Sequence, residues 1–488
     1  MKIILLVLFS IQLSLSLPSG LSLVFSEKAI NGFKALWLKE ILSELHNLEI
    51  PSQCFKTGKG ILTTKWDLYD FSLTNIQFDI NSTQINIIDT DHVVVDIEDF
   101  LCEIFFKWNS TSELDEDSGS ASISLQKTII MSKSTLYASN GHLGITINEL
   151  ELKIGNFDVE VYDSKNAKIV NWLTHNINAK IKSILEKEIS KNIKHTVEYV
   201  INIQLSQFPT LIEVPHTPFS FSVALPYGPY INSGFMKIDI LGIFVAKNEP
   251  NLFPQIPLPV DLLRNQENEL DVQLFISDYT INSALYSMYS IDMFDLTITQ
   301  KDLPSWIKLT TSFLDEILPG IESAYGPKLP CEVNCAAKKT PLLNTHEYSQ
   351  GNILGLVSGS ALIQCSVEVV DHGKAIEIES TLNSKISVIL ADGVLKGEIM
   401  ELRVENMNVT ESKLSSEIDT DGLSENLNNL IEISIPEIND SVFGKGFKLS
   451  YLEAFNIVES KMTVKTGYFH IQLEPKYPDL TNKEYFES

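Results

Sequence analysis

The chain repeats one motif about 250 residues apart, and this duplication constrains its fold more than any other feature. Residues 23–32 read LVFSEKAING and residues 273–283 read QLFISDYTINS. Each copy is an apolar strand, a Ser beside an acid that caps a helix, and a helix that opens on Ile-Asn. Residues 149–154 and 399–404 form a second similar pair at the same offset. Two landmarks at one offset predict two similar halves, each a large domain.

The first residues predict a secretory signal peptide over 1–20. Lys2 precedes an apolar run over 3–17, which small residues follow at 18–20. The run is too short to span a bilayer, and no other stretch reaches about 18 apolar residues. We therefore expect no transmembrane segment and a protein secreted to the extracellular space or the lumen of the secretory pathway. The alternative for this run is a buried first strand.

The charge balance bears on the partners of the chain. The formal net charge is −26, and Arg264 and Arg403 are the only arginines. This balance argues against nucleic acid as a partner and against simple attraction to an anionic membrane. Because arginine is the side chain that best binds phosphate through two parallel hydrogen bonds, we expect few such phosphate sites.

Four Asn-x-Ser/Thr sequons are candidate glycosylation sites. In a secretory chain we expect them on exposed turns. They are Asn81, Asn109, Asn408 and Asn439.

Five cysteines in an oxidising compartment predict disulfides. Cys54 and Cys102 are the pair of the first half, and we expect them to be bonded. In one extended strand Cys331 and Cys335 would lie about 13 Å apart, too far to bridge. One of them should therefore pair with Cys365: Cys331 is the working assignment, and Cys335 is the alternative. A metal site completed by a nearby His fits no zinc spacing, so no metal is predicted.

Periodicity predicts the order of the elements. Apolar residues at spacings of three and four predict helices over 26–45 and 168–200 in the first half, with alternating strands over 55–154 between them. The second half should repeat this order, with helices over 277–289 and 423–430 and strands over 329–409. Prolines crowd the stretch between the halves. We therefore divide the chain into the signal peptide, a first domain over 21–208, a proline-rich linker over 209–270 and a second domain over 271–488.

No catalytic constellation is present in the sequence. Residues 355–359 lack the spacing of a nucleophile elbow, and no catalytic residue is assigned. Residues 419–422 resemble the start of a calcium loop, but Asn428 stands where a bidentate Glu is needed. The chain is therefore not predicted to be an enzyme.

The apolar helix faces suggest a place for lipid. A curved antiparallel sheet packed on a long amphipathic helix leaves an apolar slot between the two, which suits acyl chains. The alternative for each residue of such a stripe is plain core. The residues predicted to border lipid are Ile30, Phe33, Trp37, Ile41, Leu173, Ile177, Ile281 and Leu285.

Three features of the chain resemble those of a known protein family. They are the duplicated strand–helix unit, the proline-rich centre, and the ending at residues 446–449 followed by strands. The chain resembles the bactericidal/permeability-increasing, lipopolysaccharide-binding and plasma lipid-transfer protein family over nearly its whole mature length. The resemblance implies an α+β fold with two barrels joined by a central sheet in a boomerang shape, the last strands of the chain adding to that sheet. It also implies an apolar pocket in each half that holds phospholipid or another lipid, and no other cofactor.

The chain departs from the family pattern in two places. Members usually tie the long helix of the first half to a strand by a disulfide, but residues 181–200 contain no Cys. Endotoxin-binding members carry a basic tip on the first barrel, whereas here residues 113–117 read ELDED. The leading hypothesis is therefore a secreted lipid-binding or lipid-transfer protein whose partners are lipids and lipid surfaces. An innate-defence protein that recognises microbial envelope lipid such as lipopolysaccharide is the alternative, and a structural or adhesion protein with vestigial pockets is a third.

Overall fold

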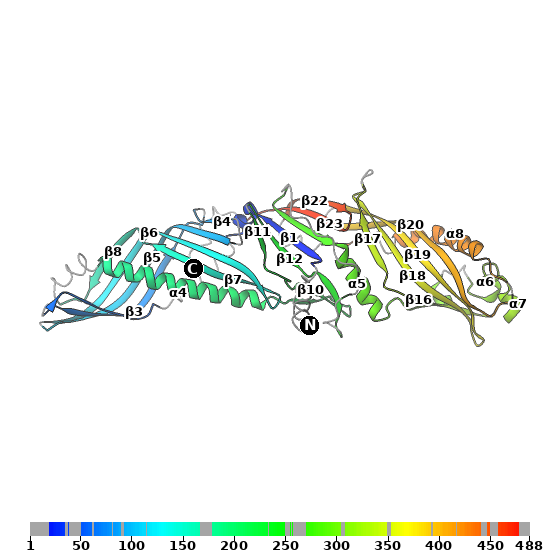
Figure 1. Ribbon diagram of the computed structural model, residues 1–488, viewed down its shortest axis with the longest axis horizontal. Helices are drawn as coiled ribbons and strands as arrows, with labels where there is room; N and C mark the ends of the chain where they lie inside the picture. The colour runs from blue at the N-terminus through cyan, green and yellow to red at the C-terminus, as the bar shows by residue number, and fades with distance from the viewer. Residues whose placement is uncertain are drawn as a thin grey trace, which may run out of the picture.

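The computed structural model is an elongated molecule with one lobe at each end and a sheet between them (Figure 1). Every strand ladder in the described part of the chain is antiparallel, which together with the long helices confirms the α+β class. The described residues are 19–34, 38, 50–60, 63–80, 82–88, 92–113, 115–165, 178–232, 234–248, 254, 256, 270–303, 308–348, 353–391, 394–415, 417–440, 447–448 and 457–477.

The first lobe is a seven-stranded sheet with one long helix against it. Its strands are β2 (Gln53–Thr57), β3 (Thr64–Gln77), β4 (Gln84–Ile88), β5 (His92–Thr111), β6 (Glu116–Ser139), β7 (His142–Lys153) and β8 (Asn156–Tyr162). The strand order is β2-β3-β5-β6-β7, with β4 added beside β5 and β8 beside β6. The helix is α4 (Asn178–Gln207).

Bulges bend this sheet around the helix. The ladder between β3 and β5 shifts register twice, and the ladder between β5 and β6 shifts near Phe100. Asp70, Asn75 and Asp99 lie at these shifts with φ of 53°, 51° and 53°. Asp and Asn tolerate this left-handed region better than most residues, and a bulge increases local twist. The strands therefore curve and enclose a core, as the predicted barrel requires.

The core of the first lobe lies between the sheet and α4. One stripe of α4, spaced every four residues, is almost fully buried: Ile181, Leu185, Ile189 and Ile193. It packs against inward-facing residues of the sheet, among them Trp66, Trp108, Phe100, Phe106, Ile104 and Ile123. Burying a side chain of this size stabilises the fold by about 1.5–3 kcal/mol. Most apolar residues in this part of the helix therefore pack in the core.

The second lobe repeats the plan. Its sheet runs β15 (Leu296–Ile298), β16 (Cys331–Ala337), β18 (Gly355–Val369), β19 (Gly373–Ala391), β20 (Val394–Ser412) and β21 (Phe447–Lys448), with β17 (Leu342–His346) added beside β18. Its helices are α5 (Asp278–Ser290), α6 (Thr311–Leu314), α7 (Ile321–Tyr325) and α8 (Thr420–Ile438), with a 3-10 turn η3 (Gln300–Asp302). A core at the far end of this lobe joins α6, α7 and the start of α8 to β16 and β18.

The central sheet mixes strands from both halves and from near both ends of the described chain. Its order is β11 (Tyr230–Asn232), β12 (Phe235–Ile240), β1 (Leu21–Ser26), β14 (Val272–Ser277), β23 (Tyr468–Pro475) and β22 (Ile457–Lys465). The two duplicated strands, β1 and β14, pair with each other directly. A small sheet of β13 (Ile243–Ala246), β10 (Phe219–Ser222) and β9 (Leu211–Glu213) lies beside it. The last strands therefore join the centre, as the family resemblance implies, while the domain boundaries remain a prediction.

The predicted helices are present with changed limits. Residues 27–34 are helical after a capping Ser26, whose hydroxyl accepts the N–H of Ala29 at 3.0 Å. Helix α4 continues to Gln207, and α8 runs over 19 residues despite Pro436. No helix appears in the described residues between 209 and 270, as the prolines predict. Residues 1–18 of the signal peptide predicted over 1–20 lie outside the described residues. Within the described residues no helix is long and apolar enough to cross a bilayer.

The predicted disulfide between Cys54 and Cys102 is wrong. Cys54 lies on β2 and Cys102 on β5, and β3 runs between these strands. Cys54 is exposed, whereas Cys102 is 1% exposed and faces the core. Two strand spacings and opposite faces of a sheet put the two sulfurs beyond bonding distance.

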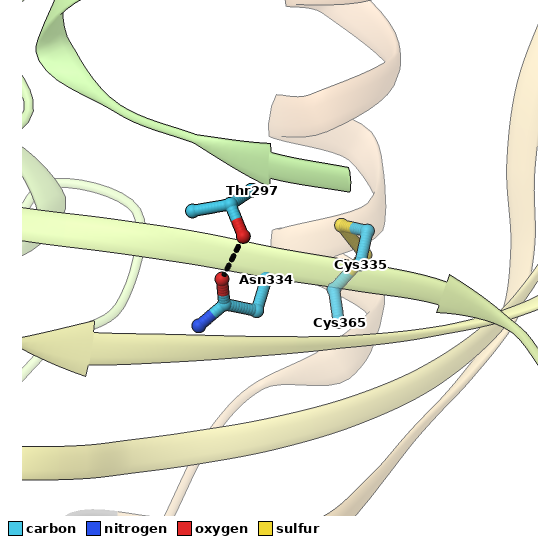
Figure 2. The surroundings of a disulfide bond; sticks show 4 residues. All are labelled: Thr297, Asn334, Cys335 and Cys365. Atoms are coloured by element: carbon cyan, nitrogen blue, oxygen red, sulfur yellow. Dashed lines mark hydrogen bonds between the residues drawn. A yellow bond between two sulfur atoms is a disulfide. The ribbon is translucent and has the colours of Figure 1, made fainter. Parts of the chain in front are cut away.

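In the second half Cys335, rather than Cys331, bonds to Cys365. The two residues lie directly opposite each other on β16 and β18, with Cα atoms 4.1 Å apart (Figure 2). Cys331 lies on the same strand, remains a free thiol and is buried among the core residues of this lobe. One cysteine of this pair was expected to stay free, and strand register decides which.

The sequons do not lie on turns where the structure describes them. Asn109 and Asn408 are exposed on strands β5 and β20. Asn439 follows α8 and is half-buried, with its side-chain amide bonded to the backbone of Ile399 on β20. Asn81 lies outside the described residues.

Candidate lipid-binding interior

The structure brings two of the predicted lipid-bordering residues to one apolar cluster. Phe33 and Ile281, which come from the two duplicated helix starts, both pack on a cluster beneath the central sheet. Ile30 joins a neighbouring cluster, and Leu285 is half-buried on α5. The first cluster consists of Ala29, Val272, Val357, Val388, Met462, Val464, Phe469, Ile471 and Leu473. Trp37, Ile41, Leu173 and Ile177 lie outside the described residues, so their contact with lipid remains a prediction.

Phe33 and Ile281 differ from ordinary core residues in their exposure. Both are only half-buried although they pack on a cluster whose members are nearly inaccessible. Phe33 also meets the ring of Tyr477 edge-on, with centroids 5.3 Å apart. Apolar side chains that pack on a core cluster without being fully covered leave surface that an acyl chain would complete.

One asparagine in each copy of the motif fixes its helix to a strand. The Asn31 amide donates to the Ile85 carbonyl at 2.8 Å and accepts the Ile85 N–H at 3.0 Å. Asn282 makes the same pair with Leu343, at 2.8 and 2.7 Å. A side-chain amide thus replaces a neighbouring strand at one residue of β4 and of β17. The repeated Ile-Asn is therefore explained by identical contacts in the two lobes.

Helix α4 uses a second set of polar side chains to cover the edge strand β7. Residues one or more steps of four apart share one flank of a helix, so these side chains all reach the same strand. Asn202 pairs with both backbone groups of Ile145 at 2.8 and 2.9 Å. Glu198 accepts the N–H of Ile147, Glu186 accepts the N–H of Ile154, and Lys194 donates to the carbonyl of Asn148, each at 3.2 Å.

Helix α8 covers the corresponding edge of the second lobe. Asn428 pairs with both backbone groups of Val404 at 2.7 and 3.0 Å. Asn439 does so with Ile399 at 2.8 and 3.1 Å. Among the described residues, strand β20 has a strand neighbour on this side only at Val394 and Leu395. The second duplicated landmark, 149–154 and 399–404, thus marks the two strand edges that the long helices cover.

These covering residues were not found from the sequence. The signal was available, because Glu186, Lys194, Glu198 and Asn202 are polar and lie at multiples of four along one helix flank. Read alone, such a row is typical of a solvated face. Only the position of β7 shows that the row faces backbone groups.

Charged groups at the centre join the two ends of the described chain. The Tyr477 hydroxyl donates to Asp271 at 2.6 Å, and the Lys28 ammonium lies 2.8 Å from Asp271 and 3.3 Å from Glu474. Burial, together with the bond to Asp271, raises the pKa of Tyr477 above its ordinary value. The Tyr477 ring also lies where a side chain at Gly32 would have to be. This contact fixes the first helix against the strands of the second half.

Two further charged groups lie beside the apolar clusters. Lys34 is buried and donates to the Thr83 carbonyl, and burial lowers its pKa. Asp278, at the start of α5, accepts the Thr345 N–H at 2.9 Å, and burial raises its pKa. Both groups bond to backbone and so fix a helix to a neighbouring segment, while the second carboxylate oxygen of Asp278 is buried without a hydrogen-bond partner. Within the described residues no group of three or more His, Cys, Asp or Glu side chains could hold a metal ion.

The tip of the first lobe is mixed in charge rather than acidic. Strand pairing brings Lys65 beside Thr111, and Thr111 beside Glu116. Lys56 lies opposite Lys65 on β2. Asp117 is buried and accepts the Ser164 hydroxyl at 2.7 Å. Lys65 of a different hairpin therefore lies two strands from Glu116, and its ammonium is 2.8 Å from Asp67.

Comparisons with known proteins agree with this architecture. The model of the C-terminal domain of the LBP / BPI / CETP family matches residues 228–477. The human (Homo sapiens) BPI fold-containing family C protein is 18% identical over 468 residues, which cover 94% of this chain and 89% of that protein. The Oryctolagus cuniculus lipopolysaccharide-binding protein is 22% identical over 285 residues, 56% of this chain and 57% of that protein. The crystal structure of lipopolysaccharide binding protein matches with a TM-score of 0.53 at 16% identity, covering 94% of this chain and 99% of that one, which shows a shared fold.

Proposed function

Because this chain belongs to the LBP / BPI / CETP family, we propose that it is a secreted carrier that holds phospholipid or a similar lipid in one apolar pocket per lobe. The observation that carries the proposal is the pair Phe33 and Ile281. Each is an apolar side chain at a duplicated helix start, faces an interior cluster and is left half-buried there. An acyl chain that covers such surface gains about 0.8 kcal/mol per buried CH₂.

The proposal does not include catalysis. The polar groups near the interior, Lys34 and Asp278, are bonded to backbone. A carrier needs apolar walls and an opening, and binding of this kind requires no reacting group.

The second candidate function is recognition of a microbial envelope lipid such as lipopolysaccharide. It is favoured by the rabbit relative, whose name states that it binds lipopolysaccharide, and by the lysines at the tip of the first lobe. The neighbouring acids at the tip weigh against a purely electrostatic contact with a phosphorylated glycolipid.

Mass spectrometry of lipid extracted from the purified full chain tests the proposal. We expect phospholipid at up to two molecules per chain. The variant Ile281→Asp places a carboxylate against the interior cluster and should lower the lipid content, since burying an unpaired charge is costly. The matched control is Leu296→Asp, at a side chain that is 58% exposed on β15. A chain that carries no lipid, or an Ile281→Asp variant that carries as much as the control, would contradict the proposal, and extraction of an envelope glycolipid would select the second candidate.

A further inference from the structure

The outward face of α4 carries a row of exposed side chains that the interior does not use. Because the buried stripe of this helix repeats every four residues, the residues opposite to it form a second row with the same spacing. All members of this outer row are exposed: Lys187, Lys191, His195, Tyr199 and Ile203. Figure 1 shows α4 in front of its sheet along most of the first lobe. The row changes from basic to apolar toward the end of the helix.

The first part of this row is locally positive in a strongly acidic chain. Helix α4 contains five lysines and three glutamates. Two of those acids direct their carboxylates to backbone N–H groups: Glu198 to Ile147 on β7, and Glu186 to Ile154 directly after β7. The third, Glu188, lies three residues before Lys191 and is its neighbour on the helix surface, so one acid offsets part of the charge of the five lysines. Two of the three acids of the helix are thus directed to backbone groups rather than to Lys187 and Lys191.

The second part of the row continues into an exposed apolar surface. Tyr199 is 61% exposed, Phe208 is 67% exposed, and Leu211 on β9 is 39% exposed. The His195 and Tyr199 rings stack with centroids 6.4 Å apart. A shallow groove of about 730 Å³ runs between this row and the flank that covers β7. Exposed aromatic and aliphatic residues beside lysines are the composition of surfaces that lie in a membrane interface.

We propose that this face of α4, together with Phe208 and the start of β9, docks the protein on a phospholipid surface. Lys187 and Lys191 would contact the phosphates, while Tyr199, Ile203 and Phe208 would enter the interface between headgroups and acyl chains. The inference rests on the proposed function, since a lipid carrier must meet a lipid surface. It adds a contact that lies outside the interior and does not depend on the charge of the tip.

Helix α8 offers an internal comparison. It covers the corresponding edge of the second lobe and also exposes an apolar side chain, Ile433, at 72%. Its charged residues are acidic, with Glu425 and Glu432 on the helix and no lysine. Charge complementarity with phosphate therefore distinguishes the face of α4 from that of its counterpart.

Sedimentation of the full chain with vesicles tests the inference. The probes are vesicles of phosphatidylcholine alone and of phosphatidylcholine mixed with phosphatidylserine. Each lysine near an anionic surface strengthens binding about fivefold. The double variant Lys187→Gln/Lys191→Gln should therefore bind the mixed vesicles about 25-fold more weakly at low salt. The difference should shrink as ionic strength rises to about 0.15 M. The control Lys338→Gln/Lys339→Gln makes the same charge change at exposed residues of the second lobe and should bind like the unaltered chain.

A second variant tests the apolar part. Ile203→Asn/Phe208→Ser should weaken binding to both kinds of vesicle by about tenfold or more, since apolar burial is lost. Ile433→Asn is its control on α8 and should have no effect. The proposed docking face would be refuted if neither variant changed vesicle binding, or if the control variants reduced it equally. It would also be refuted if the unaltered chain did not bind vesicles. Lipid content, measured on the same proteins, should be unchanged by all four variants, so it reports separately on the proposed carrier function.

Discussion

Replacing Asn282 with Ala should loosen the attachment of α5 to β17. Asn282 is 4% exposed and pairs with both the N–H and the carbonyl of Leu343. The substitution leaves both backbone groups without their partner. A buried group without a partner costs about 1–3 kcal/mol, and we take about 2 kcal/mol for the pair because Leu343 is half-buried.

Hydrogen exchange measured by mass spectrometry on peptides that contain Leu342–His346 gives the local readout. A local loss of about 2 kcal/mol corresponds to roughly 30-fold faster exchange in this strand. Asn344→Ala is the matched control, because it makes the same change at an exposed residue of the same strand. Asn31→Ala should produce the same effect on β4 in the first lobe. The reasoning fails if exchange of β17 is unchanged in Asn282→Ala, or if Asn344→Ala accelerates it equally.

Two further predictions concern the cysteines and the sequons. Native alkylation should label Cys54 and leave the buried Cys102 and Cys331 unlabelled until the chain is unfolded, and non-reducing peptide mapping should recover the bond between Cys335 and Cys365. Burial raises the pKa of Cys102 to about 12 from its ordinary 9.0, so the unfolded chain loses this proton first and stability should fall as pH rises from about 9 toward 12. Cys102→Ala should flatten that part of the denaturation profile, and an unchanged profile would refute the assignment. Glycopeptide mapping should find Asn439 unmodified, since a sugar would sit on the Nδ2 atom that donates to Ile399, whereas Asn109 and Asn408 are accessible.

The sequence determined the repeating parts of this protein. Strand and helix periods, the capping Ser26 and the offset between the two Ile-Asn motifs are local patterns, and a local pattern is complete within a short window of residues. They were sufficient to predict two similar α+β halves and the family. They also predicted that only one of Cys331 and Cys335 would bond, because that argument needs no more than the length of a strand.

Tertiary structure decided what depends on strand order and register. It set β3 between Cys54 and Cys102, and it placed Cys335 opposite Cys365. It also placed Lys65 of one hairpin two strands from Glu116 of another at the tip. Tertiary structure also decided that the polar row from Glu186 to Asn202 faces the edge of β7 rather than water, because β7 lies beside that flank of the helix. Neighbours of this kind come from segments far apart in the sequence, and no local period specifies which of them will meet.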